Sequence, residues 1–165
     1  MNIGFEWMTV FQWLENSSIA TYFRQSLWLY PAVEIIHITG FVILAGSAVL
    51  FDIRLLGFSP QLSVTNTARH LLFWARTSLI AVFPSGFILF MVDATILVSN
   101  TAFQIKMALL VLAAVNAWIF HTFTSRNIKS WNTHHPTPLA AKCAGVISIL
   151  LWVSIISSGR LIAYV

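Results

Sequence analysis

The chain has 165 residues, of which 58% are hydrophobic and only 8% are charged, and its mean hydropathy is +0.83. A soluble domain carries about 25% charged residues because its surface faces water, so this composition excludes an ordinary water-soluble globule and indicates a protein embedded in lipid. The formal net charge of +4 comes from basic residues scattered between apolar runs. This scatter argues against nucleic acid as a partner, and it carries information on membrane topology instead.

The first predicted element is a short amphipathic helix over about residues 4–14. Trp7 and Trp13 lie in it among polar residues at helical spacing, and the segment is too short to span a bilayer. We therefore expect a short N-terminal interfacial amphipathic helix on the membrane surface. The N-terminus has no basic region and carries Glu6 and Glu15 ahead of the first long apolar stretch. For this reason we expect the first spanning helix to act as its own insertion signal.

Four long apolar segments follow, each of roughly 20 residues or more, which matches a hydrocarbon core about 30 Å thick. Pro31 is expected to kink the first helix near its start, and Pro84 is expected to bend the second. The sequence therefore predicts an all-α membrane protein with four transmembrane helices in an antiparallel bundle, as one domain over residues 1–165. The four predicted helices cover about residues 22–56, 71–98, 103–124 and 140–158.

Basic residues near the helix ends predict the orientation of the bundle. The loops of membrane proteins that face the cytoplasm carry an excess of Lys and Arg, and the two sides of this bundle differ in that respect. We expect a protein of the bacterial inner membrane with both termini outside. The side expected in the cytoplasm holds Arg54, Arg69, Arg76, Arg126, Lys129 and Lys142, and the other side holds Arg24, Lys106 and Arg160.

Five strings occur in an ordered combination along nearly the whole chain. They are LWLYPAVEIIHITG at 27–40, FDIRLLG at 51–57, AFQIKMALL at 102–110, NAWIFH at 116–121 and SGRLIAYV at 158–165. Together they resemble an uncharacterised bacterial family of small four-helix inner-membrane proteins that is known only as a domain of unknown function. The resemblance implies the fold and the membrane location, and it implies no activity.

His37 is the foremost candidate for chemistry, because an ionisable group at the centre of a membrane helix costs about 2.5–3.5 kcal/mol on insertion scales. Gly40 follows one turn later on the same face, where its missing side chain would leave a flat opening for a porphyrin. His121 on the third spanning helix is the natural second ligand, so His37 and His121 form a candidate metal-ligating pair for haem b. The alternative is a neutral His37 that is hydrogen-bonded to another helix, for example to Ser85 or Asn116.

Helix geometry counts against this pair of ligands. In an antiparallel bundle His121 lies some eight residues closer to the cytoplasm than His37, which is roughly 12 Å at 1.5 Å per residue. Two axial ligands of one iron lie at similar heights. A helix tilt of about 20° and the Pro31 kink would absorb only part of the difference.

A second group of ionisable residues falls in the outer half of the predicted bundle. One interpretation is a buried ion-pair network that locks the helices together. The other is an anion site, in which a basic side chain holds haem propionates, a lipid headgroup or a quinone-like head. A haem on His37 would reach this group, so its basic members are candidate cofactor-binding residues. The group consists of Arg24, Lys106 and Arg160 with Glu34 and Asp93.

Three functions therefore remain open. The leading one is b-type haem binding with an electron-transfer role, as an electron carrier rather than a substrate-converting enzyme, since no catalytic motif is recognisable. A non-catalytic accessory or assembly subunit, bound to another membrane protein or to copies of itself, is the second. The third is a transporter or proton pathway through Glu34, His37, Asp93 and Asn116. A metal site at the adjacent residues His134 and His135 is a weaker hypothesis.

Overall fold

The computed structural model describes residues 3–132 and 136–164, and within them every regular element is helical. The predicted all-α class is thereby confirmed for this part of the chain. The elements are α1 (Ile3–Glu15), α2 (Ser18–Gln25), α3 (Leu29–Leu55), α4 (Val64–Val92), α5 (Ala94–Ser99), α6 (Thr101–Thr122), the 3₁₀ helix η1 (Thr124–Trp131) and α7 (Leu139–Leu161).

Four of these helices are long and apolar enough to cross a membrane: α3, α4, α6 and α7, with 22 to 29 residues each. Their most apolar windows reach mean hydropathies between 1.7 and 2.2. Most of that apolar surface points outward, since only 6% of the window in α6 is buried inside the molecule. A soluble protein rarely exposes so large an apolar area, so the four helices suggest a membrane protein in a lipid environment.

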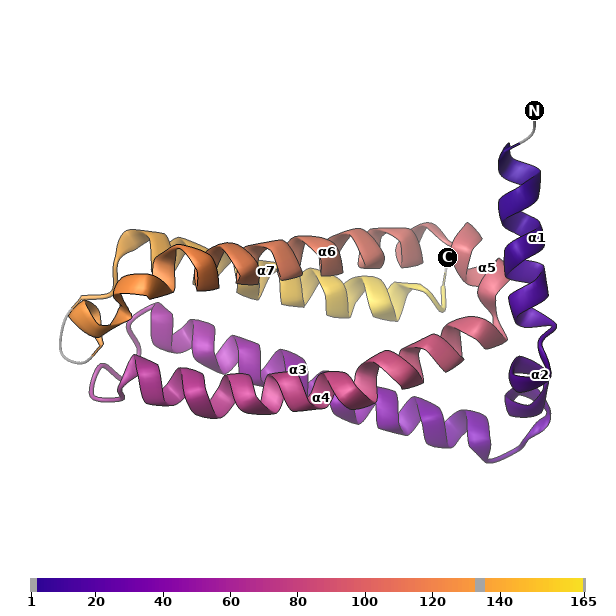
Figure 1. Ribbon diagram of the computed structural model, residues 1–165, viewed down its shortest axis with the longest axis horizontal. Helices are drawn as coiled ribbons and strands as arrows, with labels where there is room; N and C mark the ends of the chain where they lie inside the picture. Colours follow the sequence, from indigo (N-terminus) through magenta and orange to yellow (C-terminus); the bar gives the residue numbers. More distant parts are fainter. Residues whose placement is uncertain (1–2, 133–135, 165) are drawn as a thin grey trace.

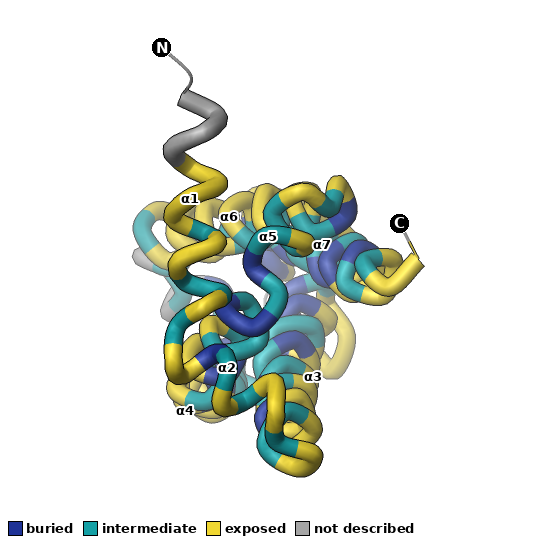
Figure 2. Tube along the Cα trace, turned by 90° about the vertical axis from the view of Figure 1, so that its right-hand side faces the viewer, coloured by how far each residue is buried: buried dark blue, intermediate teal, exposed yellow. Residues whose placement is uncertain are grey.

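The long helices pack as two pairs. α3 lies along α4, α6 lies along α7, and α3 also packs against α7, so that α3 and α7 join the pairs (Figure 1). Aromatic rings fill this junction at two levels: Phe41 meets Trp152 at 5.8 Å between ring centroids, and Phe51 meets Phe120 at 5.7 Å. Viewed along the bundle, the buried segments face its middle and the exposed ones face outward (Figure 2).

The short helices α1, α2 and α5 gather at one end of the bundle, and α1 runs across the direction of the long helices (Figure 1). α1 packs against α5 and the end of α4. Trp7, Val10 and Trp13 on α1 remain largely exposed. The predicted N-terminal helix is therefore present, two residues longer than expected, and its direction suits a helix that lies in the plane of a membrane surface.

The first predicted spanning helix differs from the observed one. Its expected start at residue 22 lies within α2, and α3 begins only at Leu29. Ser26 adopts an extended conformation that ends α2. Its hydroxyl oxygen accepts a hydrogen bond from the backbone amide of Leu29, with 3.2 Å between nitrogen and oxygen. Pro31 is the third residue of α3, where a helix needs no backbone N–H donor. Pro31 therefore belongs to the first turn of α3, and the kink expected from it is not required.

The second predicted helix also differs. α4 starts seven residues early, at Val64, because the hydroxyl of Ser63 caps it by accepting the amide of Asn66 at 3.3 Å. It ends at Val92, where Asp93 leaves the helical conformation with φ −130° and ψ 36° before α5 begins. α4 continues through Pro84 and bends along its length toward α5, as predicted (Figure 1). α6 and α7 lie within three residues of their predicted bounds.

Candidate functional site

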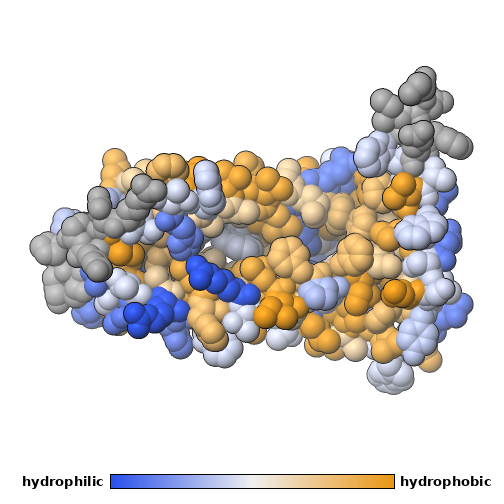
Figure 3. Space-filling model, viewed as in Figure 1, coloured by the Kyte–Doolittle hydropathy of each residue, from blue (hydrophilic) through white to orange (hydrophobic). Residues whose placement is uncertain are grey.

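A groove of about 630 Å³ lies between α4 and α6, at the opposite end of the bundle from α1. In the space-filling view this face has hydrophilic atoms set in a mostly hydrophobic surface (Figure 3). Among the described residues, three basic side chains line the groove: Arg69, Arg76 and His121. The apolar part of its wall is formed by Phe51, Ala68, Leu72, Phe73, Ile80, Phe120 and Ile128.

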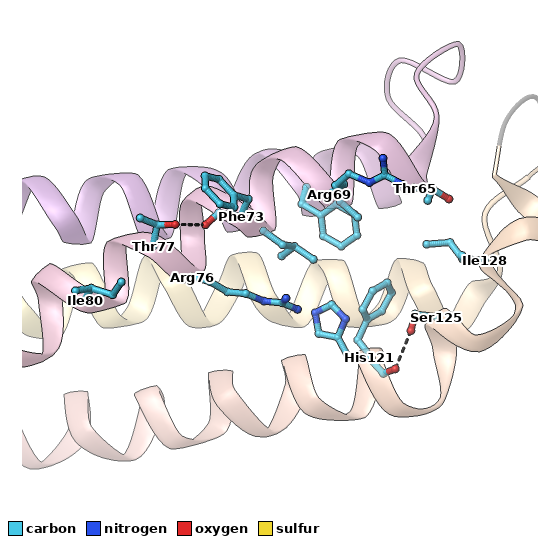
Figure 4. A pocket seen from close by; sticks show the side chains of 13 residues that line it. Thr65, Arg69, Phe73, Arg76, Thr77, Ile80, His121, Ser125 and Ile128 are labelled. Atoms are coloured by element: carbon cyan, nitrogen blue, oxygen red, sulfur yellow. Dashed lines mark hydrogen bonds between the residues drawn. The ribbon is translucent and has the colours of Figure 1, made fainter.

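The helical repeat places the two arginines on one face of α4. Arg69 and Arg76 are seven residues apart, which is two turns, so both side chains border the same groove. Figure 4 shows the guanidinium of Arg76 reaching across toward the imidazole of His121, and the two groups interact electrostatically. Within the described residues neither arginine forms an ion pair with an acid. The groove therefore carries positive charge that no carboxylate compensates there.

His121 is positioned by the end of α6. It is the second-last residue of the helix, and its backbone carbonyl accepts the hydroxyl of Ser125 at 2.7 Å. The ring of Phe120 packs edge-on to the imidazole at 5.5 Å between centroids. An imidazole beside an apolar wall can ligate a metal, and a guanidinium can bind carboxylate or phosphate in a bidentate fashion. The combination suits an amphiphilic ligand with an apolar body and anionic groups.

His37 lies elsewhere, between α3 and α4. Its Nδ1 is 3.2 Å from the carbonyl of Val82 and 3.1 Å from the hydroxyl of Ser85. A side chain on Gly86 would lie 2.8 Å from the ring, so the glycine makes room for the imidazole itself. The space beside Gly40 is likewise filled by α4, because a Cβ there would lie 2.9 Å from Val82. The structure thus shows the bond from His37 to Ser85 that one of the two interpretations expected, and this bond is made by Nδ1.

The structure does not bring His37 and His121 together. His37 contacts α4 at Ser85, whereas His121 faces Arg76 on the same helix. These two positions on α4 are nine residues apart, which corresponds to about 13 Å along the helix at 1.5 Å per residue. This separation agrees with the depth difference expected from the sequence. The two imidazole rings therefore lie against different parts of α4.

The three outer basic residues each have a different environment. Arg24 pairs with Glu15, at 3.7 Å, and donates to the carbonyl of Val92. Arg160 donates to the hydroxyl of Tyr164 at 2.8 Å and stacks on its ring. Lys106 points into the space left by Gly159 and interacts electrostatically with His37. In the part of the chain that the structure describes, the only ion pair is the one between Glu15 and Arg24.

The residues of the predicted proton pathway contact different helices. The side-chain amide of Asn116 donates to the carbonyl of Ala144 on α7, at 3.1 Å, while His37 is bonded to α4. Asp93 caps the end of α4, and Glu34 is exposed. His134 and His135 lie outside the described residues. Among the described residues no group of three or more His, Cys, Asp or Glu side chains could hold a metal ion.

Two buried charged residues near the end of α3 were not predicted from the sequence as site residues. Arg54 is only 4% exposed, and its guanidinium donates to the carbonyls of Leu62, Pro60 and Asn132, the first at 2.7 Å. Asp52 is only 6% exposed. Two charges in the last turn of a 27-residue apolar helix were the available signal, since such charges need specific partners.

A model of a family of unknown function, DUF6644, matches residues 10–165. The match includes all four apolar helices and all five strings noted above. The chain belongs to this family. The resemblance inferred from those strings is therefore confirmed. No curated protein and no solved structure matches the chain, so the function of this DUF6644 member rests on the chemistry of its own residues.

Proposed function

We propose that this DUF6644 member is a bacterial inner-membrane protein that binds b-type haem in the groove between α4 and α6 and carries electrons. The observation that carries the proposal is the combination, in one groove of about 630 Å³, of an imidazole with two uncompensated guanidinium groups and an apolar wall. A haem has an apolar macrocycle, an iron that accepts an imidazole, and two anionic propionates. The three parts of the groove correspond to these three parts of the ligand.

His121 would hold the iron, and Arg69 and Arg76 would hold the propionates. Of the residues first predicted to bind the cofactor, His121 alone lines the groove. His37, Arg24, Lys106 and Arg160 have the other partners described above, and the proposal assigns them no contact with haem. The iron would supply the one-electron chemistry, while the protein fixes its position and, through two positive charges, favours the more negative reduced state.

We further propose that α3, α4, α6 and α7 cross the membrane as an antiparallel bundle with both termini outside. Arg54, Arg69 and Arg76 all lie toward the end of the bundle that carries the groove, and the positive-inside rule places that end in the cytoplasm. Single cysteines on a Cys143→Ser background test this topology with a membrane-impermeant thiol reagent. We expect Asn16→Cys to be labelled in intact spheroplasts and Gln61→Cys only in inverted vesicles. The reverse pattern would overturn the orientation.

The haem proposal is tested by the absorbance spectrum of the protein purified in mild detergent after expression with ample haem. We expect a Soret band that is lost in His121→Ala and retained in His37→Ala. Arg69→Ala and Arg76→Ala should each weaken haem retention, because each removes one propionate partner. His70→Ala is the matched control, since His70 is an exposed histidine on α4 that does not line the groove.

Two results would overturn the assignment. The first is the absence of a Soret band both after expression and after reconstitution with haem. The second is a band that survives in His121→Ala and disappears in His37→Ala, which would move the ligand out of the groove. Native mass spectrometry distinguishes a haem site from a lipid site. An anionic phospholipid that is retained by the wild type and lost in the double variant Arg69→Ala with Arg76→Ala would identify a lipid site instead.

A further inference from the structure

The carboxyl group of Asp52 is buried in the contact between α3 and α7. The residue is only 6% exposed. The two helices approach each other closely at this level, since a Cβ added to Gly145 on α7 would lie 3.3 Å from the backbone oxygen of Asp52. No side chain of residue 145 therefore separates the helices here. Leu55, one turn further along α3, is fully buried in the same contact.

The hydrogen bonds of this carboxyl are incomplete. The side chain of Ser148, which lies on α7 one turn after Gly145, interacts with this carboxyl. Oδ2 of Asp52 has no hydrogen-bond partner within the described residues. Among those residues it is the one buried side-chain oxygen or nitrogen that lacks a partner. A carboxylate has about four lone-pair sites to satisfy, so a single hydroxyl meets only part of its demand.

No cation within the described residues compensates a charge on Asp52. Arg54 is two residues away, but its guanidinium is occupied by loop carbonyls at the end of the bundle. Lys142 is the cation of α7 closest to this face, one turn before Gly145, and it forms no ion pair with Asp52. The cations that α4 contributes nearby, Arg69 and Arg76, border the groove.

An ionised carboxylate in this position would be a charge removed from water without a counter-ion, which is strongly unfavourable in a protein interior. A bound proton removes the charge. The neutral acid also needs fewer partners, because it presents one hydroxyl and one carbonyl oxygen, and the hydroxyl of Ser148 can serve either of them. A proton, unlike a metal ion, requires neither further ligands nor a cavity.

We infer that Asp52 and Ser148 form a proton-binding site inside the bundle, in which the carboxyl of Asp52 carries a proton at neutral pH. This site is independent of what the groove binds. It lies at the same level of α3 as the groove, because the neighbouring residue Phe51 forms part of the groove wall. The ligand is H⁺, and the site can release it only if the contact between α3 and α7 opens to water.

Infrared spectroscopy of the purified full-length protein at neutral pH tests this inference, because a protonated carboxylic acid has a C=O stretch distinct from carboxylate bands. We expect one such band, downshifted in D₂O, that is lost in Asp52→Asn. Glu15→Gln is the matched control: Glu15 has Arg24 and Thr95 as partners and should be ionised, so the band should persist. Labelling the carboxyl carbon of aspartate with ¹³C should shift the band.

Ser148→Ala keeps the carboxyl in place and removes its one hydroxyl partner. We expect the band to remain at a shifted frequency, which also covers the case that Asp52→Asn fails to fold. The inference is overturned if the wild type shows no protonated-acid band at neutral pH, or if the band persists in Asp52→Asn. It is also overturned if the frequency is the same in Ser148→Ala and the wild type. None of these results depends on a Soret band, so the two proposals fail separately.

Discussion

The carboxylate of Glu15 lies 3.7 Å from the guanidinium of Arg24, and this ion pair joins the end of α1 to α2. Glu15 also accepts hydrogen bonds from the amide and the hydroxyl of Thr95 on α5. Arg24 in turn donates to the carbonyl of Val92 at the end of α4. One acid and one base thus link four helices at the end of the bundle that lies away from the groove.

This link predicts that the N-terminal helices loosen in acid. The hydrogen bonds from Thr95 lower the pKa of Glu15 below its ordinary value of 4.5, and the charge of Arg24 adds to this effect. The stabilisation by ionised Glu15 is therefore complete above pH 4.5, the ordinary pKa of the group. It is lost as the pH falls through the lower pKa that Glu15 has in the folded state. Limited proteolysis between α2 and α3 should become faster in acid for the wild type.

Glu15→Gln provides the control for this prediction. The variant should be cut at a faster rate already at neutral pH and should lose most of the acid dependence, with a stability change of about 1 kcal/mol or less because the ion pair is partly exposed. An equal acceleration by acid in the variant and the wild type would assign the effect to another group.

A second prediction concerns the contact of His37 with α4. Gly86→Ala places a methyl group 2.8 Å from the imidazole ring, so the ring must leave Val82 and Ser85, at a cost of about 1–3 kcal/mol for overpacking. Gly46→Ala is the matched control, because a Cβ at Gly46 meets nothing within 4 Å. Thermal unfolding in detergent should show a clear loss of stability for Gly86→Ala and no loss for Gly46→Ala.

The double variant of Gly86→Ala with His37→Ala sharpens the test. Removing the ring removes the clash, so the double variant should be more stable than the sum of the two single losses implies. Strict additivity would mean that the methyl group disturbs something other than His37.

A third prediction concerns Arg54. Its guanidinium binds carbonyls of the loop after α3 and of Asn132, and hydrogen bonds to a charged group contribute about 1.5–3 kcal/mol. Arg54→Ala should therefore lower the stability by about 2–3 kcal/mol, and Arg54→Lys should recover only part of it, because an ammonium cannot reproduce the planar fork. In protein prepared without haem, Arg69→Ala, which changes an exposed arginine, should leave the melting temperature nearly unchanged.

Hydropathy was enough to predict the four long helices, because a spanning helix must be apolar over most of its length. The interruptions at Ser26 and Asp93 were not predictable in the same way. Each depends on side-chain hydrogen bonds or backbone angles that hydropathy does not record. Likewise, the early start of α4 follows from the Ser63 cap, a local signal outside the apolar run.

The candidate site was predicted only in part. His121 was identified because an ionisable residue in an apolar helix is conspicuous, and the depth difference from His37 followed from helix rise alone. The pairing of His121 with Arg69 and Arg76 depends on which faces of α4 and α6 border the same groove. Helix packing decides that, and the spacing of residues within a single helix does not. Glu15 and Thr95 are 80 residues apart and were missed for the same reason.

The groove is bordered by α4 and α6, whereas α3 and α7 close the bundle behind it. In a bilayer, a ligand would then enter sideways from the acyl-chain phase instead of through an aqueous mouth. Occupancy would follow the mole fraction of ligand dissolved in the membrane, and every surrounding lipid would compete for the same space. Affinities compared at different detergent-to-protein ratios would therefore disagree even if the residues that bind the ligand were unchanged.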